Sequence, residues 1–397
     1  MTDIAPTSEA EIVDAVLAAS DPMLICGNNG KSGLLRPMQT AQTLTTRALT
    51  GITLYSPQEL IIAARSGTPL AEIEAAVAER GQHLIAEPPD FSGLFGATTP
   101  QTLGGVVAAN LSGPRRVAWG AMRDHVMGLR AVNGSGEAIH SGGRVLKNVT
   151  GLDLCKLLTG SHGTLAVITE ITLKVLPTPQ RRGTLVLQGL DPEAAVAAMS
   201  AALGSPYAVS AAAHLPAEAA ASIPVLAQFQ ASITLARIED FSASVTYRLD
   251  RLARDLSAYG AGTLLDDAES TSAWAAIRDA APLRHQPGAL WRVSVRPSNG
   301  PKIVAALQSQ ATQWFMDWGG GLIWIAGPAI PSMHQSVRAA ARASGGTWTL
   351  FRGPDGLRAS VDVLPPEPPA LEKIRRAVKA AFDPKSLFNP GRMYAGL

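Results

Sequence analysis

The sequence has few cysteines and no long apolar run. Cys26 and Cys155 are the only cysteines among 397 residues. Two cysteines are too few to ligate an iron–sulfur cluster or a structural zinc ion, and we find no secretory signal before them. The most apolar stretch, residues 319–330, is too short to span a bilayer. These absences favour a cytoplasmic protein that would reach a membrane only through its partners.

An excess of charge of one sign is missing as well. The formal net charge is +2, and no five like charges follow one another. The sequence therefore gives no electrostatic basis for binding nucleic acid. Isolated basic pairs such as Arg115 and Arg116 usually lie on a solvated face, unless a glycine-rich loop is beside them.

Several signatures of catalytic chemistry are also missing. A phosphate-binding loop that ends at Gly30-Lys31-Ser32 would need glycine at position 25, which is Ile25, and Pro37 would interrupt its helix. No G-x-G-x-x-G follows a strand, which excludes the usual nicotinamide fingerprint. The seven histidines form no H-E-x-x-H or other close pair, and no G-x-S-x-G elbow occurs. We therefore predict no metal site.

What the sequence does have is enough apolar material for two folded domains. Hydrophobic residues make up 46% of the chain and charged residues 17%. A single core stops growing at roughly 250–300 residues, so 397 residues indicate two domains. After Thr178 the composition shifts to alanine-rich helices with sparse strands, and we place the domain boundary there.

The first glycine-rich loop follows a helix and a strand. Ser8 and Glu11 form a capping-box pattern that begins a helix ending near Ala19. Residues 23–26 then form a short apolar strand, which leads into residues 27–33. Three glycines in this loop allow its amide groups to point at one place, as in an anion-binding loop.

The segments that follow predict alternating strands and helices. Residues 52–55 and 60–64 are expected to pair as strands, and Thr68 is expected to cap a helix that ends at Gly81. Further strands are expected at residues 126–132, 138–140, 170–176 and 232–236, and a helix at residues 371–381.

Two more glycine-rich tracts occupy residues 102–113 and 160–169. Any one such loop is more often a simple turn than a binding site, because glycine is common. Three of them, each entering or leaving a strand, suit a long polyanionic dinucleotide held by backbone amides. Glycine placement is therefore the main sequence signal for a cofactor.

The ordered set of these motifs resembles the FAD-binding domain of the vanillyl-alcohol oxidase and p-cresol methylhydroxylase superfamily. Within it, the chain is most similar to the family of second FAD-binding subunits of bacterial glycolate oxidase. Two groups of residues carry the resemblance: the superfamily motifs at 27–33, 102–105, 112–113, 123–126, 160–164 and 389–392, and the family segments at 113–116, 147–154, 291–294, 317–320 and 389–394.

The resemblance implies an α+β fold with three parts. Residues 1–178 would form the p-cresol-methylhydroxylase-type FAD-binding domain of two α+β subdomains. Residues 179–370 would form a smaller α+β cap on the substrate side, and residues 371–397 a C-terminal tail that returns to the FAD-binding domain.

The resemblance also implies the cofactor and the residues that hold it. Relatives that attach FAD covalently often carry a histidine in the first loop, and residues 27–33 contain none, so non-covalent FAD is implied. Most of the contacts would come from the main chain. The implied cofactor-binding residues are Gly27, Asn28, Asn29, Gly30, Lys31, Ser32, Thr102, Leu103, Gly104, Gly105, Ser112, Gly113, Asp124, Gly163, Ile168 and Asn389.

The reaction implied is oxidation of glycolate, a 2-hydroxy acid, to glyoxylate. An FAD-dependent subunit would pass electrons to a second FAD subunit and an iron–sulfur subunit. Relatives that oxidise 2-hydroxy acids carry a His-x-His metal pair, which this sequence lacks. A non-catalytic flavin-bearing subunit that stabilises its catalytic partner is therefore the alternative, and a stand-alone oxidase of another alcohol is a weaker one.

Two arginines are candidates for the chemistry. Arg392 could place positive charge near the flavin, or it could pair with an exposed carboxylate at the tail. Arg292 could clamp a substrate carboxylate, or it could face water from a strand whose other face is buried. No histidine stands out as a base: His125 and His162 lie in cofactor loops, and only its place near Trp291 suggests His285.

Overall fold

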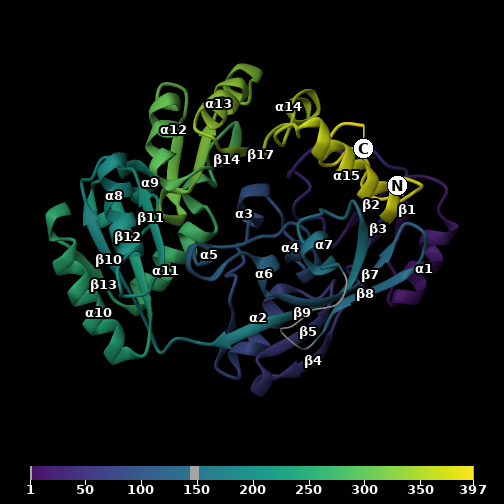
Figure 1. Cartoon of the computed structure of the whole chain (residues 1–397), viewed down its shortest axis with the longest axis horizontal. Helices are drawn as coiled ribbons and strands as arrows, with labels where there is room; N and C mark the ends of the chain where they lie inside the picture. The colour runs from purple at the N-terminus through teal and green to yellow at the C-terminus, as the bar shows by residue number, and fades with distance from the viewer. Residues whose placement is uncertain (1, 144–151, 397) are drawn as a thin grey trace.

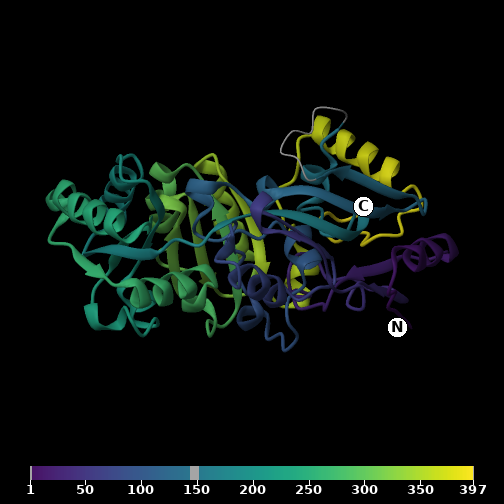
Figure 2. The same ribbon diagram turned by 90° about the horizontal axis from the view of Figure 1, so that it is seen from below.

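The chain has two parts: the first is built on a small parallel sheet and a larger antiparallel sheet, and the second on one large antiparallel sheet, with helices against them (Figures 1 and 2). The computed structural model describes residues 2–143 and 152–396, so residues 147–151 of one family segment lie outside it. Within the described residues, no helix has both the length and the apolar character needed to cross a bilayer.

A small parallel sheet near the N-terminus positions the first glycine-rich loop. Ser8 accepts a hydrogen bond from the Glu11 amide and begins helix α1, which confirms the predicted cap. The predicted strand before the loop is also confirmed, as β2. The elements are β1 (Thr2–Ile4), α1 (Glu9–Ala18), β2 (Met23–Cys26) and β3 (Gln42–Thr45), with the strand order β1-β3-β2.

The rest of the first part is an antiparallel sheet covered by short helices. The predicted pairing of residues 52–55 with residues 60–64 is confirmed, as is the hairpin that begins at Val126. The strands are β4 (Ile52–Ser56), β5 (Ile61–Arg65), β6 (Gln82–Leu84), β7 (Val126–Asn133), β8 (Ala138–Gly142) and β9 (Ala166–Pro177). The helices are α2 (Leu70–Ala78), α3 (Ser92–Phe95), α4 (Leu103–Ala108), α5 (Arg116–Trp119), α6 (Met122–His125) and α7 (Leu154–Leu158).

The predicted cap of helix α2 was wrong. Pro69, not Thr68, is the residue before the helix, and no side chain caps it. The Thr68 hydroxyl instead accepts a hydrogen bond from the Gly51 amide, at 3.0 Å. A threonine hydroxyl can accept a hydrogen bond from any backbone amide within reach, and here that amide is the one of Gly51, just before strand β4.

The second part contains far more strand than the sequence predicted. Its sheet is eight-stranded, in the order β13-β10-β12-β11-β15-β16-β14-β17. The sparse-strand prediction failed at β11, which carries three consecutive alanines but is buried along its whole length. Burial in the middle of a sheet overrides the helix propensity of alanine.

Strands and helices are interspersed along the sequence of the second part. The strands are β10 (Arg181–Gln188), β11 (Val209–Leu215), β12 (Ile233–Asp240), β13 (Thr263–Leu265), β14 (Ala289–Ser294), β15 (Gln313–Asp317), β16 (Leu322–Gly327) and β17 (Thr347–Arg352). The main helices are α8 (Pro192–Leu203), α9 (Ala217–Ala221), α10 (Ser242–Asp255), α11 (Asp267–Arg278), α12 (Gly300–Leu307), α13 (Pro331–Ala343) and α14 (Asp355–Ser360). Both large sheets are antiparallel, which confirms the predicted α+β class.

The C-terminal tail lies against the first part of the chain, beside the small parallel sheet (Figure 1). It begins with α15 (Pro369–Phe382), the predicted tail helix. The Asn389 side chain then accepts from the Ile25 amide at 2.8 Å and donates to the carbonyl oxygens of Ile25 and His162. One amide group thus joins the tail to two of the glycine-rich segments.

Candidate cofactor and substrate site

A pocket opens where the first two glycine-rich segments and the tail meet. Strand β2 leads into it, helix α4 begins beside it, and the tail closes it. Its lining includes Gly27, Asn28, Asn29, Gly30, Lys31, Thr102, Gly104, Gly105, His162, Gly163, Ile168, Asn389 and Arg392.

Glycines allow the first two glycine-rich segments to approach each other closely. A β-carbon at Gly27 would lie 2.3 Å from the Thr102 hydroxyl oxygen, so only glycine allows this approach. The same hydroxyl accepts from the Gly105 amide and caps helix α4. A β-carbon at Gly105 would lie 3.5 Å from the Lys31 ammonium nitrogen, so this glycine faces the pocket. The loops are therefore shaped for something that approaches the backbone closely.

The charges in the pocket are positive and unbalanced. Among the described residues, no carboxylate lies within ion-pair distance of Lys31, and burial lowers the pKa of its ammonium group to about 8. Burial, with Arg392 and Lys31 nearby, lowers the pKa of His162 to about 3, so His162 is neutral. A cation with no counter-charge beside open backbone amides fits a polyanion such as the diphosphate of FAD.

The Arg392 guanidinium mainly organises the first loop. It donates to the carbonyl oxygens of Arg36 and Lys31, at 3.0 and 3.2 Å. Burial, followed by the nearby Arg358, lowers its pKa to about 10. Arg392 therefore brings positive charge to the pocket, while its hydrogen bonds go to the backbone of the first loop and the residues just after it.

The implied cofactor residues fall into two groups in space. Most of them line the pocket. Five do not: Leu103 is buried in the core, Ser32 bonds through its carbonyl to Arg358, and Ser112, Gly113 and Asp124 lie beyond helix α4. The Gly113 carbonyl instead accepts from the Trp318 indole, 3.1 Å away in the second part.

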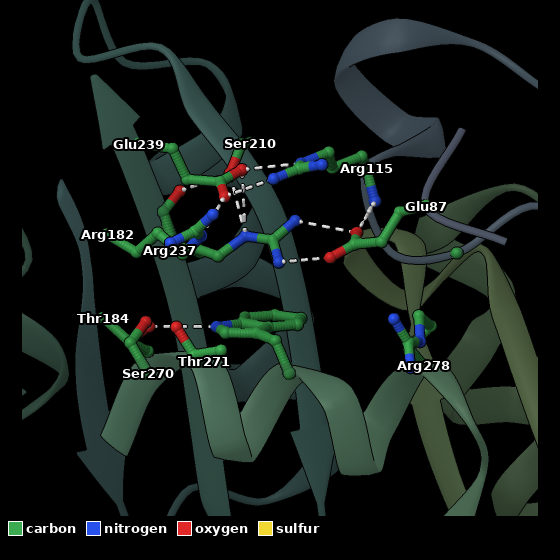
Figure 3. Close-up of polar contacts among 12 residues, drawn as sticks. Glu87, Arg115, Arg182, Thr184, Ser210, Arg237, Glu239, Ser270, Thr271 and Arg278 are labelled. Atoms are coloured by element: carbon green, nitrogen blue, oxygen red, sulfur yellow. Dashed lines mark hydrogen bonds and ion pairs between the residues drawn. The ribbon is translucent and has the colours of Figure 1, made fainter. Parts of the chain in front are cut away.

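A network of paired charges crosses the joint between the two parts near this point (Figure 3). Arg237 of β12 donates to both carboxylate oxygens of Glu87, at 2.8 and 3.0 Å. Arg115 donates to both oxygens of Glu239, at 2.9 and 2.7 Å. Each pair joins the first part to the second. We call these four residues the paired cluster.

The arginines hold both carboxylates of the paired cluster in the charged form. Burial alone would raise the pKa of Glu239, but Arg237 and Arg115 hold it well below its usual range. The same balance of burial against Arg237 and Arg115 lowers the pKa of Glu87. The charges of this cluster therefore compensate one another.

Two other arginines in the joint have no such partners. The Arg292 guanidinium lies over the rings of Trp318, Trp324 and Phe351, at 5.4, 5.1 and 5.8 Å. The Arg116 guanidinium lies over the Trp318 ring at 4.6 Å. Among the described residues, neither has a carboxylate within ion-pair distance. We call Arg116 and Arg292 the unpaired cluster.

The position of Arg292 lies between the two interpretations of its strand. Its side chain is half-buried among aromatic rings, so it neither lies in the core nor points into open water. Its Nε atom is buried and bonds to no acceptor in the described part of the chain. Burial, and then the nearby Arg116, lowers its pKa to about 10. Its role as a carboxylate clamp stays a prediction.

One acidic group lies close to the unpaired cluster. Asp317 is 3% exposed and accepts a hydrogen bond from the Trp318 amide at 2.7 Å. Burial, together with the charge of Glu87, raises its pKa to about 7, although the Trp318 amide, Arg237 and Arg292 oppose this. Near neutral pH this carboxyl group is about half protonated, so it offsets only part of the charge of Arg292.

Sequence reasoning did not select Arg116, Asp317 or Trp318 as functional residues. The only signal was that residues 113–116 and 317–320 belong to family segments. Trp318 has φ of 53°, in the left-handed region that a bulky residue seldom adopts. Two adjoining glycines make this turn visible in the sequence, but its contact with Arg116 depends on how the two parts dock.

Comparison with known proteins agrees with these features. The FAD binding domain family matches residues 3–142. Glycolate oxidase subunit GlcE of Escherichia coli is 35% identical over 98% of this chain and 97% of its own length. D-lactate dehydrogenase of Archaeoglobus fulgidus is 34% identical over 45% of this chain and 39% of its own length.

Solved structures support the fold. p-Cresol methylhydroxylase superposes with a TM-score of 0.72 and 13% identity, over 98% of this chain and 88% of its own. Alkyldihydroxyacetonephosphate synthase gives a TM-score of 0.70 and 17% identity, over 98% and 76%. The predicted fold type is confirmed.

Proposed function

Because the chain belongs to the GlcE family of glycolate oxidase subunits and carries an FAD-binding domain, we propose that it oxidises glycolate to glyoxylate as an FAD-linked subunit of a larger complex. The observation that carries the proposal is the half-buried Lys31 ammonium group beside Gly105, which has no carboxylate within ion-pair distance among the described residues, in a pocket lined by all three glycine-rich segments. A long, flexible dinucleotide with a diphosphate suits that pocket.

The residues of the pocket would hold FAD without a covalent bond. FAD held there would supply the hydride acceptor for oxidation of the hydroxyl-bearing carbon of the substrate. Lys31 would offset phosphate charge, and the glycine-rich segments would offer their amides. Arg392 would fix the first loop and add positive charge. Arg292 would bind the substrate carboxylate. The cofactor-binding set is the one that the resemblance implies, with Ser112, Gly113 and Asp124 toward the joint.

The proposal includes three structural roles along the chain. Residues 1–178 hold the cofactor, residues 179–370 supply the substrate-side cap, and residues 371–397 close the cofactor pocket. The hydrogen bonds of Asn389 to Ile25 and His162 support the role of the tail.

Electrons from the flavin would leave through partner subunits. The two cysteines of the chain cannot ligate an iron–sulfur cluster. We therefore assign the next carriers to a second FAD subunit and an iron–sulfur subunit. The complex would work in the cytoplasm, with any membrane contact made by those partners.

The test is a flavin measurement on a variant matched with a control. Gly105→Val puts a side chain into the pocket, whereas a β-carbon at Gly356 of helix α14 would meet nothing within 4 Å. We expect the wild type and Gly356→Val to show flavin absorption bands that acid precipitation releases into the supernatant. Gly105→Val should lack them.

The complex reconstituted with each variant is then assayed with glycolate and a dye acceptor. Loss of turnover with Gly105→Val supports a catalytic role for the FAD of this chain. Full turnover without that FAD would leave the chain as a structural partner. Full FAD content in Gly105→Val would overturn the assigned pocket.

A further inference from the structure

We propose that Arg116 and Arg292 form a single carboxylate-binding site across the joint, and that this site holds the carboxylate of a small 2-hydroxy monocarboxylic acid. The identity of the acid rests on the proposed function. The site itself rests on the charges, contacts and backbone of the joint.

The first step is the missing partner of Arg292. Taking an ion out of water without a counter-ion is costly, and cation–π contacts with aromatic rings offset only a small part of that cost. The Arg292 Nε donor is sealed from water and bonds to nothing in the described part of the chain. A guanidinium group offers donors in a planar fork, which matches the two oxygens of a carboxylate.

The second step is the presence of Arg116 over the same indole ring. It comes from helix α5 of the first part, and Arg292 comes from strand β14 of the second. Two like charges over one ring repel each other unless an anion lies near both. Docking of the two parts therefore creates an anion-binding position that neither part has alone.

The backbone at Trp318 supports the same conclusion. Residues 318–320 have φ of 53°, 67° and 95°, so three consecutive residues adopt the left-handed region. Such a conformation is strained for a tryptophan. The Trp318 indole also donates to the Gly113 carbonyl across the joint. These features fix the Trp318 ring, which the guanidinium groups of Arg116 and Arg292 face at 4.6 and 5.4 Å.

The surroundings favour a small acid with one carboxylate. Among the described residues, the aromatic rings of Trp318, Trp324 and Phe351 face Arg292, and Phe91 lies edge-on to the last two. The nearby charged groups that act on it are Arg116 and Asp317. A second carboxylate would meet apolar rings or the acidic Asp317. The site should therefore bind glycolate more tightly than its dicarboxylate analogue tartronate.

The experiment measures glycolate binding by the FAD-loaded protein. Glycolate, tartronate and ethylene glycol are titrated separately by calorimetry under anaerobic conditions, and the flavin bands report that FAD stays bound. Arg116→Gln and Arg292→Gln should each weaken glycolate binding about tenfold to hundredfold, the value of one or two charge-assisted hydrogen bonds. Ethylene glycol, which has no carboxylate, should not bind.

Arg338→Gln is the matched control. Arg338 also lies over a tryptophan ring, that of Trp348 at 5.5 Å, but it has Asp362 as a partner at 3.6 Å. Glycolate affinity should not change in this variant. If Arg292→Gln does not fold, Arg292→Lys keeps the charge, loses the fork and should still weaken binding.

The outcomes separate this site from the proposed function. Wild-type glycolate affinity in both glutamine variants would overturn the site, as would tartronate binding more tightly than glycolate. If those variants also kept their FAD and their turnover in the complex, the proposed function would stand without the site. Loss of FAD binding by the wild-type protein would instead count against the proposed function.

Discussion

The joint between the two parts contains two clusters of arginines that differ in what surrounds them. In the paired cluster, Arg115 and Arg237 each meet a carboxylate through two hydrogen bonds. In the unpaired cluster, Arg116 and Arg292 meet aromatic rings. Arg115 and Arg237 are buried, whereas Arg116 and Arg292 are half-buried. The two clusters therefore differ both in their exposure and in whether a carboxylate faces the guanidinium group.

The difference indicates two separate roles. A buried arginine with a bidentate carboxylate holds parts of the chain together, because removing either partner strands the other charge. A half-buried arginine without one costs stability, and proteins keep such groups where a ligand completes them. The paired cluster therefore serves docking, and the unpaired cluster serves binding.

The largest expected effect comes from breaking the paired cluster. Arg237→Met leaves Glu87 buried and without its bidentate partner, and should lower the free energy of unfolding by about 3–5 kcal/mol. Chemical denaturation measures this. The control is Arg254→Met, since the pair of Arg254 and Asp250 is 65% and 59% exposed; it should cost about 0.5 kcal/mol. Equal losses in the two variants would remove the distinction between buried and exposed pairs.

The next effect concerns Asp317 and depends on pH. Its pKa is raised in the folded protein from 3.8 to about 7, so folding favours the protonated form. The stability that this form contributes is complete below about pH 4 and is lost as pH rises toward about pH 7.

Asp317→Asn keeps the acceptor for the Trp318 amide and removes the titration. It should therefore be more stable than the wild type by about 2–4 kcal/mol at about pH 8, with little difference at about pH 4. Denaturation at both pH values measures this. A constant difference between the two proteins would show that Asp317 titrates normally.

Lys31→Met tests the other uncompensated cation. Without its ammonium group, FAD should bind about tenfold to hundredfold more weakly, and the apoprotein should lose no stability. Fluorescence titration of the apoprotein with FAD measures the affinity. Lys302→Met, at an exposed position of helix α12, is the control. Unchanged FAD affinity in Lys31→Met would show that this cation does not face the phosphates.

The smallest expected effect, that of Arg292→Met, distinguishes the two clusters most clearly. Arg292→Met removes a half-buried cation that has no counter-ion in the described part of the chain, so the free energy of unfolding should change by less than about 1 kcal/mol. This contrasts with Arg237→Met in the same sheet. A loss as large as that of Arg237→Met would show that Arg292 serves the fold.

Local signals in the sequence predicted much of the first part. Ser8 marked the start of helix α1, and the strands predicted at residues 52–55, 60–64, 126–132 and 138–140 form the two hairpins. Most of the residues that the family resemblance implies for FAD line one pocket, and the glycines among them stand where a close backbone approach needs them.

The second part could not be predicted in the same way. Strand β11 is rich in alanine, and only its place in the middle of the sheet keeps it extended. No local pattern in the sequence predicts either arginine cluster. Arg237 and Glu87 are 150 positions apart, and nothing in the sequence shows that Arg115 would meet a carboxylate while its neighbour Arg116 would meet an indole.

The most direct test of the account is a double-mutant cycle between Arg116 and Arg292, measured as the glycolate affinity of the FAD-loaded protein. If one carboxylate lies between both guanidinium groups, either single substitution already disrupts the site. The account therefore predicts that Arg116→Gln combined with Arg292→Gln loses less binding free energy than the sum of the two single losses. Losses that simply add, or no loss at all, would contradict a shared carboxylate.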